Sequence, residues 1–100
     1  MHLADVKLPS KWTALSSYVE VTENDTYIIV NSSPDLIYAV EGSATPIAGV
    51  IGVPVAPGNY INYKKGGQTS LYLRNGYTPV RVGDVDTQNK ISNITINKVG

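Results

Sequence analysis

The sequence predicts an all-β protein, a small antiparallel β-sandwich or barrel-like domain with hairpins. Short apolar segments are separated by clusters of turn-forming residues about every eight to twelve positions, which is the spacing of strands in a sandwich or barrel. Two alternating runs, 69–74 and 77–82, meet at Asn75-Gly76, the dipeptide that favours a type I′ hairpin turn. With 100 residues, the chain 1–100 is expected to form one domain with a thin core.

The predicted hairpin around Asn75-Gly76 has a definite register. A two-residue turn places Leu71 opposite Val80 and Leu73 opposite Thr78, so that apolar residues share one face. Turn chemistry and alternation agree, and this agreement favours an all-β chain.

The remaining elements follow from similar patterns. Residues 11–16 are expected to form the only turn of helix, with Trp12 and Leu15 facing the same way and Trp12 in the core. The chain is more polar from residue 84 and then alternates as a closing strand. Further strands are predicted at 4–8, 18–22, 27–31, 36–41, 47–53, 60–63 and 91–98.

A second hairpin is predicted at 27–41, because residues 31–35 are a dense cluster of turn formers between two apolar strands. Both faces of these strands are apolar, so we expect one face to be covered by another subunit. The predicted contacting residues are Tyr27, Ile29, Tyr38 and Val40, and Ile29→Asp is expected to block assembly without unfolding the monomer. The alternative is that the segment with Trp12 and Leu15 covers this face.

The segment 45–58 contains Pro46, Pro54 and Pro57. Because proline cannot donate to a strand ladder, this segment is predicted to be an edge strand or an extended arm that leads into a Pro57-Gly58 turn. An arm would reach a neighbouring molecule, whereas the other interpretation is a long sandwich loop. Its interface candidates are Val50, Ile51 and Val53.

Composition excludes several classes of function. Eight basic and eight acidic residues cancel, which argues against a nucleic-acid partner. No apolar run is long enough for a membrane span, and the first residues do not have the pattern of a secretory signal. There is no cysteine for a disulfide, so a homo-oligomer is the expected source of added stability.

Catalytic and metal-binding patterns are weak. His2 is alone, and no serine has the surroundings of an activated nucleophile, so an enzyme is not expected. The run 84–89 begins like a calcium loop but has Asn89 where glycine is needed and Thr95 where glutamate is needed. No cofactor and no metal are predicted.

An alternative function is glycan or receptor binding by a β-sandwich module of a fibre. Tyr63, Tyr77 and Asn62 are the candidates, because aromatic faces beside amide groups suit sugar rings. Strand alternation places Tyr60 on the face opposite Tyr63, which weakens the prediction of one flat aromatic patch.

The pattern over residues 3–82 resembles the small virion structural proteins of tailed bacteriophages. The residues that carry this resemblance are Leu8-Pro9, Trp12-Thr13-Ala14-Leu15-Ser16, Val30-Asn31-Ser32-Ser33, Tyr38-Ala39-Val40, Pro57-Gly58 and Leu71-Tyr72-Leu73-Arg74. The resemblance implies a β-sandwich subunit of the particle, either a capsid decoration (head) protein or a component of a head-fibre or tail-fibre base. It implies no catalytic residues. The expected partners are a major capsid or fibre protein, and the expected location is the virion, after synthesis in the bacterial host cytoplasm.

Overall fold

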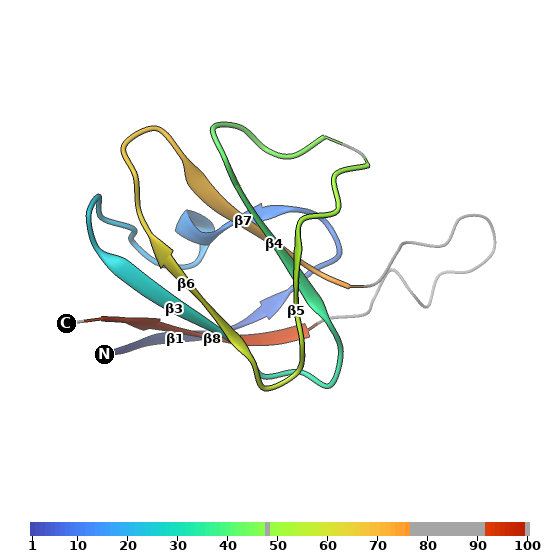
Figure 1. The fold of residues 1–100 in the computed structure, drawn as a ribbon. Coiled ribbons are helices and arrows are strands. Elements are labelled where there is room, and N and C mark those ends of the chain that lie inside the picture. The colour runs from blue at the N-terminus through green and yellow to red at the C-terminus, as the bar shows by residue number, and fades with distance from the viewer. Residues whose placement is uncertain (48, 77–91, 100) are drawn as a thin grey trace.

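The computed structural model describes residues 1–47, 49–76 and 92–99, and the strands within them form two antiparallel sheets (Figure 1). Sheet A has the strand order β1-β8-β3-β6 and sheet B has the order β2-β7-β4-β5. Buried side chains of both sheets form one core. The predicted all-β sandwich is therefore confirmed.

Sheet A consists of β1 (His2–Leu8), β3 (Thr26–Asn31), β6 (Tyr60–Lys64) and β8 (Ser92–Lys98). Sheet B consists of β2 (Thr13–Ala14), β4 (Ile37–Gly42), β5 (Val53–Val55) and β7 (Ser70–Asn75). A 3-10 turn, η1 (Leu15–Ser17), follows β2.

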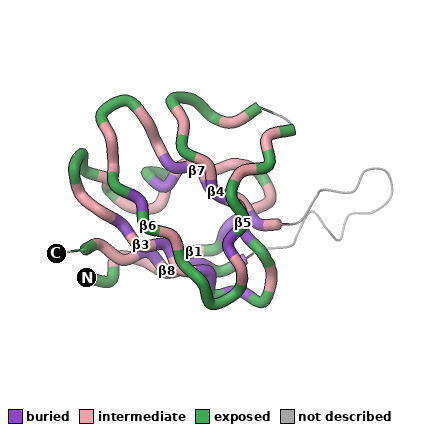
Figure 2. The backbone as a smooth tube through the Cα atoms, in the orientation of Figure 1, coloured by how far each residue is buried: buried purple, intermediate pink, exposed green. Residues whose placement is uncertain are grey.

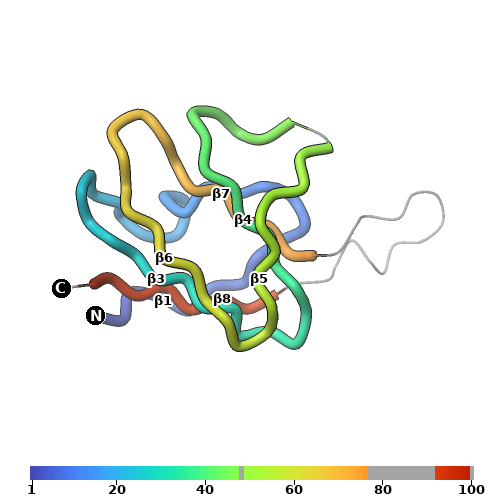
Figure 3. The backbone as a smooth tube through the Cα atoms, viewed as in Figure 1, coloured from blue at the N-terminus to red at the C-terminus, as the bar shows by residue number. Residues whose placement is uncertain are grey.

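The strand pairing identifies the type of sandwich. Working inward from the two ends of the described chain, β1 pairs with β8, β2 with β7, β3 with β6 and β4 with β5. One further pairing completes each sheet: β3 pairs with β8 in sheet A, and β4 pairs with β7 in sheet B. A long antiparallel ribbon has thus been rolled up into two sheets, which is the arrangement of a jelly roll. In Figure 3 the first and last of these strands run side by side.

Strict alternation within the strands produces the core between the sheets. In β3, Tyr27 and Ile29 are 1% and 0% exposed, whereas Ile28 and Val30 face outward and are partly buried. Figure 2 shows the buried positions recurring along the facing strands. The buried apolar residues are Leu8, Leu15, Tyr27, Ile29, Ile37, Ala39, Val55, Tyr63, Leu71, Leu73, Ile94 and Ile96.

The predicted hairpin at 27–41 is wrong, because β3 and β4 lie in different sheets. The turn formers 31–35 carry the chain from sheet A to sheet B instead of returning it to the same sheet. The Asn31 side chain is buried and accepts hydrogen bonds from the main chain and the hydroxyl of Ser33, which fixes this passage. An Asn-Ser-Ser-Pro-Asp run therefore marks a turn without revealing which strands pair.

The predicted type I′ turn at Asn75-Gly76 is also wrong. Asn75 does not have the positive φ that this turn requires; it extends β7, and its buried side chain donates to the carbonyl of Leu8 at 3.1 Å. Moreover, β7 lies between β2 and β4, so that Leu73 faces Thr13 and Ala39. The second half of the predicted hairpin, 77–82, lies outside the described residues.

Two predicted strands are not strands. Residues 18–22 form a loop whose main chain is attached to the core by the Tyr27 hydroxyl, which accepts a 2.8 Å hydrogen bond from the Thr22 amide. Of the strand predicted at 47–53, only Val53 lies in a strand, because β5 begins there. β5 is nevertheless the edge of sheet B, as the three prolines predicted.

The predicted Pro57-Gly58 turn is confirmed. The Asn59 amide donates to the carbonyl of Ala56 at 3.0 Å, and Gly58 has φ +80 at the third position of the turn, as in a type II turn. The closing strand is confirmed as β8, whereas residues 84–91 lie outside the described part of the chain. Trp12, expected in the core, is only partly buried on the outside of sheet B.

Candidate functional site

The outer face of sheet A carries an open hollow of about 350 Å³, lined by polar and apolar residues. We call it the sheet A hollow, and its lining residues are Asp5, Val6, Lys7, Ser32, Asn93, Ile94 and Thr95. Antiparallel pairing of β1 with β8 places Asp5 opposite Thr95 and Lys7 opposite Asn93. Ser32 joins them because its amide donates to the Asn93 carbonyl at 3.0 Å.

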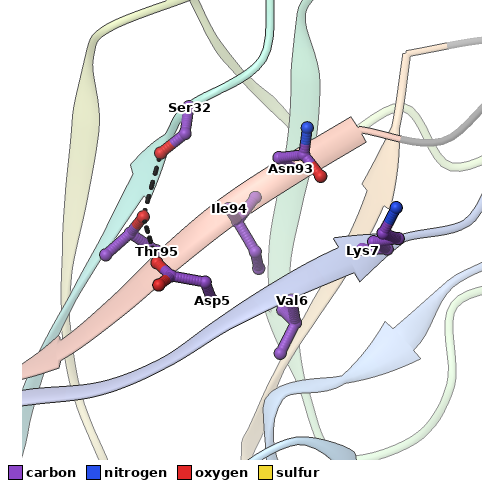
Figure 4. Close-up of a pocket in the computed structure, with 7 residues that line it drawn as sticks. All are labelled: Asp5, Val6, Lys7, Ser32, Asn93, Ile94 and Thr95. Carbon is purple, nitrogen blue, oxygen red and sulfur yellow. Dashed lines mark hydrogen bonds between the residues drawn. The ribbon is translucent and has the colours of Figure 1, made fainter.

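A chain of hydrogen bonds fixes the side chains on one side of this hollow (Figure 4). The Thr95 hydroxyl donates to Asp5 Oδ1 at 2.8 Å and lies 3.0 Å from Ser32 Oγ. His2 Nε2 lies 3.2 Å from Asp5 Oδ2. The hydrogen bond from Thr95, followed by that from His2, lowers the pKa of the Asp5 carboxyl below its ordinary value. Asp5 is therefore a fixed, ionised acceptor at neutral pH.

The same face continues toward the other edge of sheet A. Val30 is the neighbour of Thr95 on one side and of Tyr60 on the other, so Asp5, Thr95, Val30 and Tyr60 form one row across the four strands. Tyr60 is 59% exposed. The row thus has a carboxylate at one end, an aromatic ring at the other and an apolar residue between them.

The structure describes two of the three predicted glycan-binding residues, and it buries one of them. Tyr63 is 4% exposed and its hydroxyl donates to the Thr69 carbonyl at 3.3 Å, so this ring belongs to the core and is wrong as a sugar platform. Asn62 is exposed on the outer face, and Tyr77 lies outside the described residues. The predicted opposition of Tyr60 and Tyr63 is confirmed.

The sequence did not indicate the sheet A hollow. Asp5 and Thr95 come from nearly opposite ends of the chain, and only their pairing across β1 and β8 brings them together. The available signal was the alternation of polar and apolar residues in 92–97, which marked Asn93 and Thr95 as outward-facing without naming their neighbours.

Two of the predicted interface residues are wrong. Tyr27 and Ile29 fill the core, so their side chains are not available to a partner. Tyr38 and Val40 do face outward from β4, where they are partly buried. β3 and β4 are therefore apolar on both faces without pairing with each other. Each strand turns one face to the core and the other face to the outside of its own sheet.

On the outer face of sheet B, an arginine is held between two aromatic rings. The Arg74 guanidinium carbon lies 5.2 Å from the centre of the Trp12 ring and 4.7 Å from that of Tyr38. Arg74 also donates to the Asn75 carbonyl at 2.9 Å. The alternative expectation was that Trp12 and Leu15 cover the 27–41 strands. Arg74 lies over the rings of both Tyr38 and Trp12, whereas Leu15 is in the core.

An exposed apolar segment projects from the end of sheet B between β4 and β5 (Figures 1 and 2). We call it the 47–53 segment. Ile47, Ile51 and Val53 are 76%, 66% and 60% exposed, and Val50 is partly buried. Its main chain is shaped by a turn in which the Val50 amide donates to the Ile47 carbonyl at 3.3 Å. The predicted interface residues Val50, Ile51 and Val53 thus lie together on an exposed segment.

No group of three metal-ligating side chains occurs among residues 1–47, 49–76 and 92–99. Within the same ranges, no helix has the length and apolar character needed to cross a membrane.

Comparisons with known proteins give no family: no protein-family model matches the chain, and neither a curated protein nor a solved structure is significantly similar to it.

Proposed function

We propose that this chain is a structural protein of a tailed-bacteriophage virion, a capsid decoration (head) protein or a component of a head-fibre or tail-fibre base. In this role it acts by assembly with a major capsid or fibre protein and with copies of itself. The single observation that carries the proposal is the exposed 47–53 segment, with three large apolar side chains more than half exposed.

Leaving these large apolar side chains in water is unfavourable. Burying a side chain of the size of Ile47 or Ile51 contributes about 1.5–3 kcal/mol, before the costs of association and ordering. Single exposed apolar residues are common, whereas three within one projecting segment are typical of a contact surface. The segment precedes the edge strand β5, so a partner there need not displace any strand of sheet B.

The architecture supports the same proposal by analogy. Jelly rolls occur in viral capsid proteins, and also in lectins and other binding domains. This analogy raises the expectation of an assembly role but does not identify one, because one fold hosts many functions. The resemblance of residues 3–82 to small virion proteins favours the capsid among these possibilities.

The test uses particles of a bacteriophage that encodes this chain. We expect purified particles to contain the chain at a fixed ratio to the major capsid or fibre protein, measured by quantitative mass spectrometry. The double variant Ile51→Asp with Val53→Asp is expected to fold, as judged by circular dichroism, but to be missing from the particles. Val99→Asp is a matched control, because Val99 is 52% exposed and lies outside the segment. Particles without the wild-type chain contradict the proposal.

A further inference from the structure

The sheet A hollow has the chemistry of a site for a neutral, polyhydroxylated ligand, and we propose that it binds a glycan of at least two sugar units. This inference goes beyond assembly and uses the opposite face of the sandwich from the aromatic cluster of sheet B. It also differs from the sequence-based glycan platform, because Tyr63 belongs to the core.

Counting protons shows which groups remain for a ligand. The Thr95 hydroxyl has one proton and gives it to Asp5, so the 3.0 Å contact between Ser32 and Thr95 uses the proton of Ser32. The Ser32 oxygen therefore keeps both lone pairs as acceptors, and each Asp5 oxygen keeps further acceptor capacity. The wall formed by these three residues is rich in acceptors and already fixed in position.

The donors come from the neighbouring pair on the same two strands. Lys7 and Asn93 face each other across β1 and β8, and both are exposed. Lys7 supplies an ammonium group, and the Asn93 amide both donates and accepts. A hydroxyl group also donates and accepts, so a ligand with several hydroxyl groups can use both kinds of side chain.

The charges of the hollow give no net preference for an ion of either sign. An anion attracted by Lys7 also meets the ionised Asp5 carboxylate, and a cation attracted by Asp5 also meets Lys7. A metal ion would find a single carboxylate among the described lining residues. Asp5 and Lys7 together leave the hollow close to neutral. A neutral ligand that forms many hydrogen bonds fits this pattern best.

Tyr60 sets the size of the ligand. It lies two strands from Thr95, with Val30 between them, so their main chains are about 10 Å apart at the usual strand spacing. A sugar ring stacked on the exposed Tyr60 face places the next ring over Val30 and toward the Thr95 hydroxyl. A disaccharide therefore spans the row from the aromatic ring to the sheet A hollow.

The test is a titration of the isotope-labelled chain with cellobiose, maltose, lactose and N,N′-diacetylchitobiose, followed by the shifts of main-chain amides in NMR spectra. We expect at least one disaccharide to shift Asp5, Asn93, Thr95 and Tyr60 together. Asn93→Ala and Tyr60→Ala are each expected to weaken that binding at least tenfold. Tyr72→Ala, which removes an aromatic ring from the outer face of sheet B, is the matched control and is expected to leave it unchanged.

The proposal is overturned if none of the four disaccharides shifts these amides and a glycan array probed with the wild-type chain also shows no binding. It is equally overturned if a sugar binds but Asn93→Ala and Tyr60→Ala leave its affinity unchanged, because the site then lies elsewhere. Neither result bears on assembly, since Asn93→Ala leaves the 47–53 segment intact and is expected to enter particles normally.

Discussion

The side-chain amide of Asn31 in β3 donates a 2.9 Å hydrogen bond to the main-chain carbonyl of Val55 in β5 and so connects sheet A to sheet B. The same amide donates to the Asp35 carbonyl at 2.7 Å. The Asn31 side-chain oxygen accepts hydrogen bonds from the Ser33 amide at 3.0 Å and from the Ser33 hydroxyl at 2.6 Å. All four hydrogen-bonding positions of a buried side chain are thus occupied.

Asn31→Asp keeps the shape of this side chain but removes both donors. It places a carboxylate against the carbonyls of Val55 and Asp35, so we expect a loss of about 3 kcal/mol or more in the free energy of unfolding. The measurement is urea denaturation at neutral pH. Asn62→Asp is the control, because Asn62 is exposed, and its effect is expected to stay within about 0.5 kcal/mol. Equal effects of the two variants would show that the connection between the sheets contributes little.

Most strand positions could be predicted from this sequence, although 18–22 and most of 47–53 are not strands, whereas strand partners could not be predicted. Alternation in 27–31 and 36–41 located β3 and β4 to within a residue. Their partners are distant in sequence: β3 pairs with β6 and β8, and β4 with β5 and β7. The turn-forming residues 31–35 are equally compatible with a chain that returns within one sheet and with a chain that crosses to the other sheet. The hydrogen bonds of the buried Asn31 side chain favour the crossing.

The candidate sites differ in the same way. The 47–53 segment could be predicted as part of an edge strand or arm, because its apolar residues, its glycines and the flanking Pro46 and Pro54 are local features of the sequence. The sheet A hollow could not, because Asp5 becomes the neighbour of Thr95 only through the jelly-roll pairing of the first and last strands. Alternation in 27–31 places Tyr27 and Ile29 on one face of the strand, but it does not reveal which face of the strand is toward the core.

Ile29 and Ile51 separate a core position from a contact position. Ile29 is 0% exposed, so Ile29→Asp is now expected to unfold the isolated domain, in contrast to the expectation from sequence. Ile51→Asp is expected to leave the melting temperature unchanged, because Ile51 is largely exposed. Circular dichroism with thermal melting checks both. If the wild-type chain self-associates in analytical ultracentrifugation, Ile51→Asp is expected to reduce that association; a folded Ile29→Asp domain would contradict the core assignment.

Thr95→Val is expected to raise the pKa of Asp5 toward its ordinary value. The hydroxyl of Thr95 is the largest cause of the lowered pKa, ahead of His2, and valine keeps the shape of threonine without that donor. Because the folded-state pKa is lowered, the stabilising contribution of Asp5 is present at higher pH and is lost as the pH falls through the folded-state pKa. The carboxyl carbon shift of Asp5, followed by NMR across acidic pH, measures the value in both proteins. An unchanged pKa in Thr95→Val means that this hydrogen bond does not form in solution.

Arg74 is expected to stabilise the outer face of sheet B through its two ring contacts. Arg74→Gln removes the positive charge held between Trp12 and Tyr38 and is expected to cost about 0.5–2 kcal/mol of unfolding free energy. Arg74→Lys keeps the charge but loses the planar group that stacks on the rings, so an intermediate loss is expected. Urea denaturation followed by fluorescence suits this test, because Trp12 is the only tryptophan in the sequence. Identical stabilities of the three proteins would rule out a net contribution from the cluster.

Gly52 and Gly58 form a matched pair for separating backbone strain from steric crowding. Their φ angles are +81 and +80, so replacement by alanine costs each of them about 1–2 kcal/mol in backbone conformation. A Cβ at Gly58 meets no atom within 4 Å, whereas a Cβ at Gly52 lies 2.8 Å from the Ala39 carbonyl oxygen and 3.0 Å from Trp12.

We therefore expect Gly52→Ala to destabilise the domain clearly more than Gly58→Ala in urea denaturation and to alter Trp12 fluorescence, which Gly58→Ala leaves unchanged. The additional loss of unfolding free energy in Gly52→Ala measures how closely the chain before β5 packs against β4 and Trp12. This packing positions the 47–53 segment. Equal losses with unchanged fluorescence would mean that this part of the chain moves away from sheet B at little cost, and that the segment has no fixed position before it meets a partner.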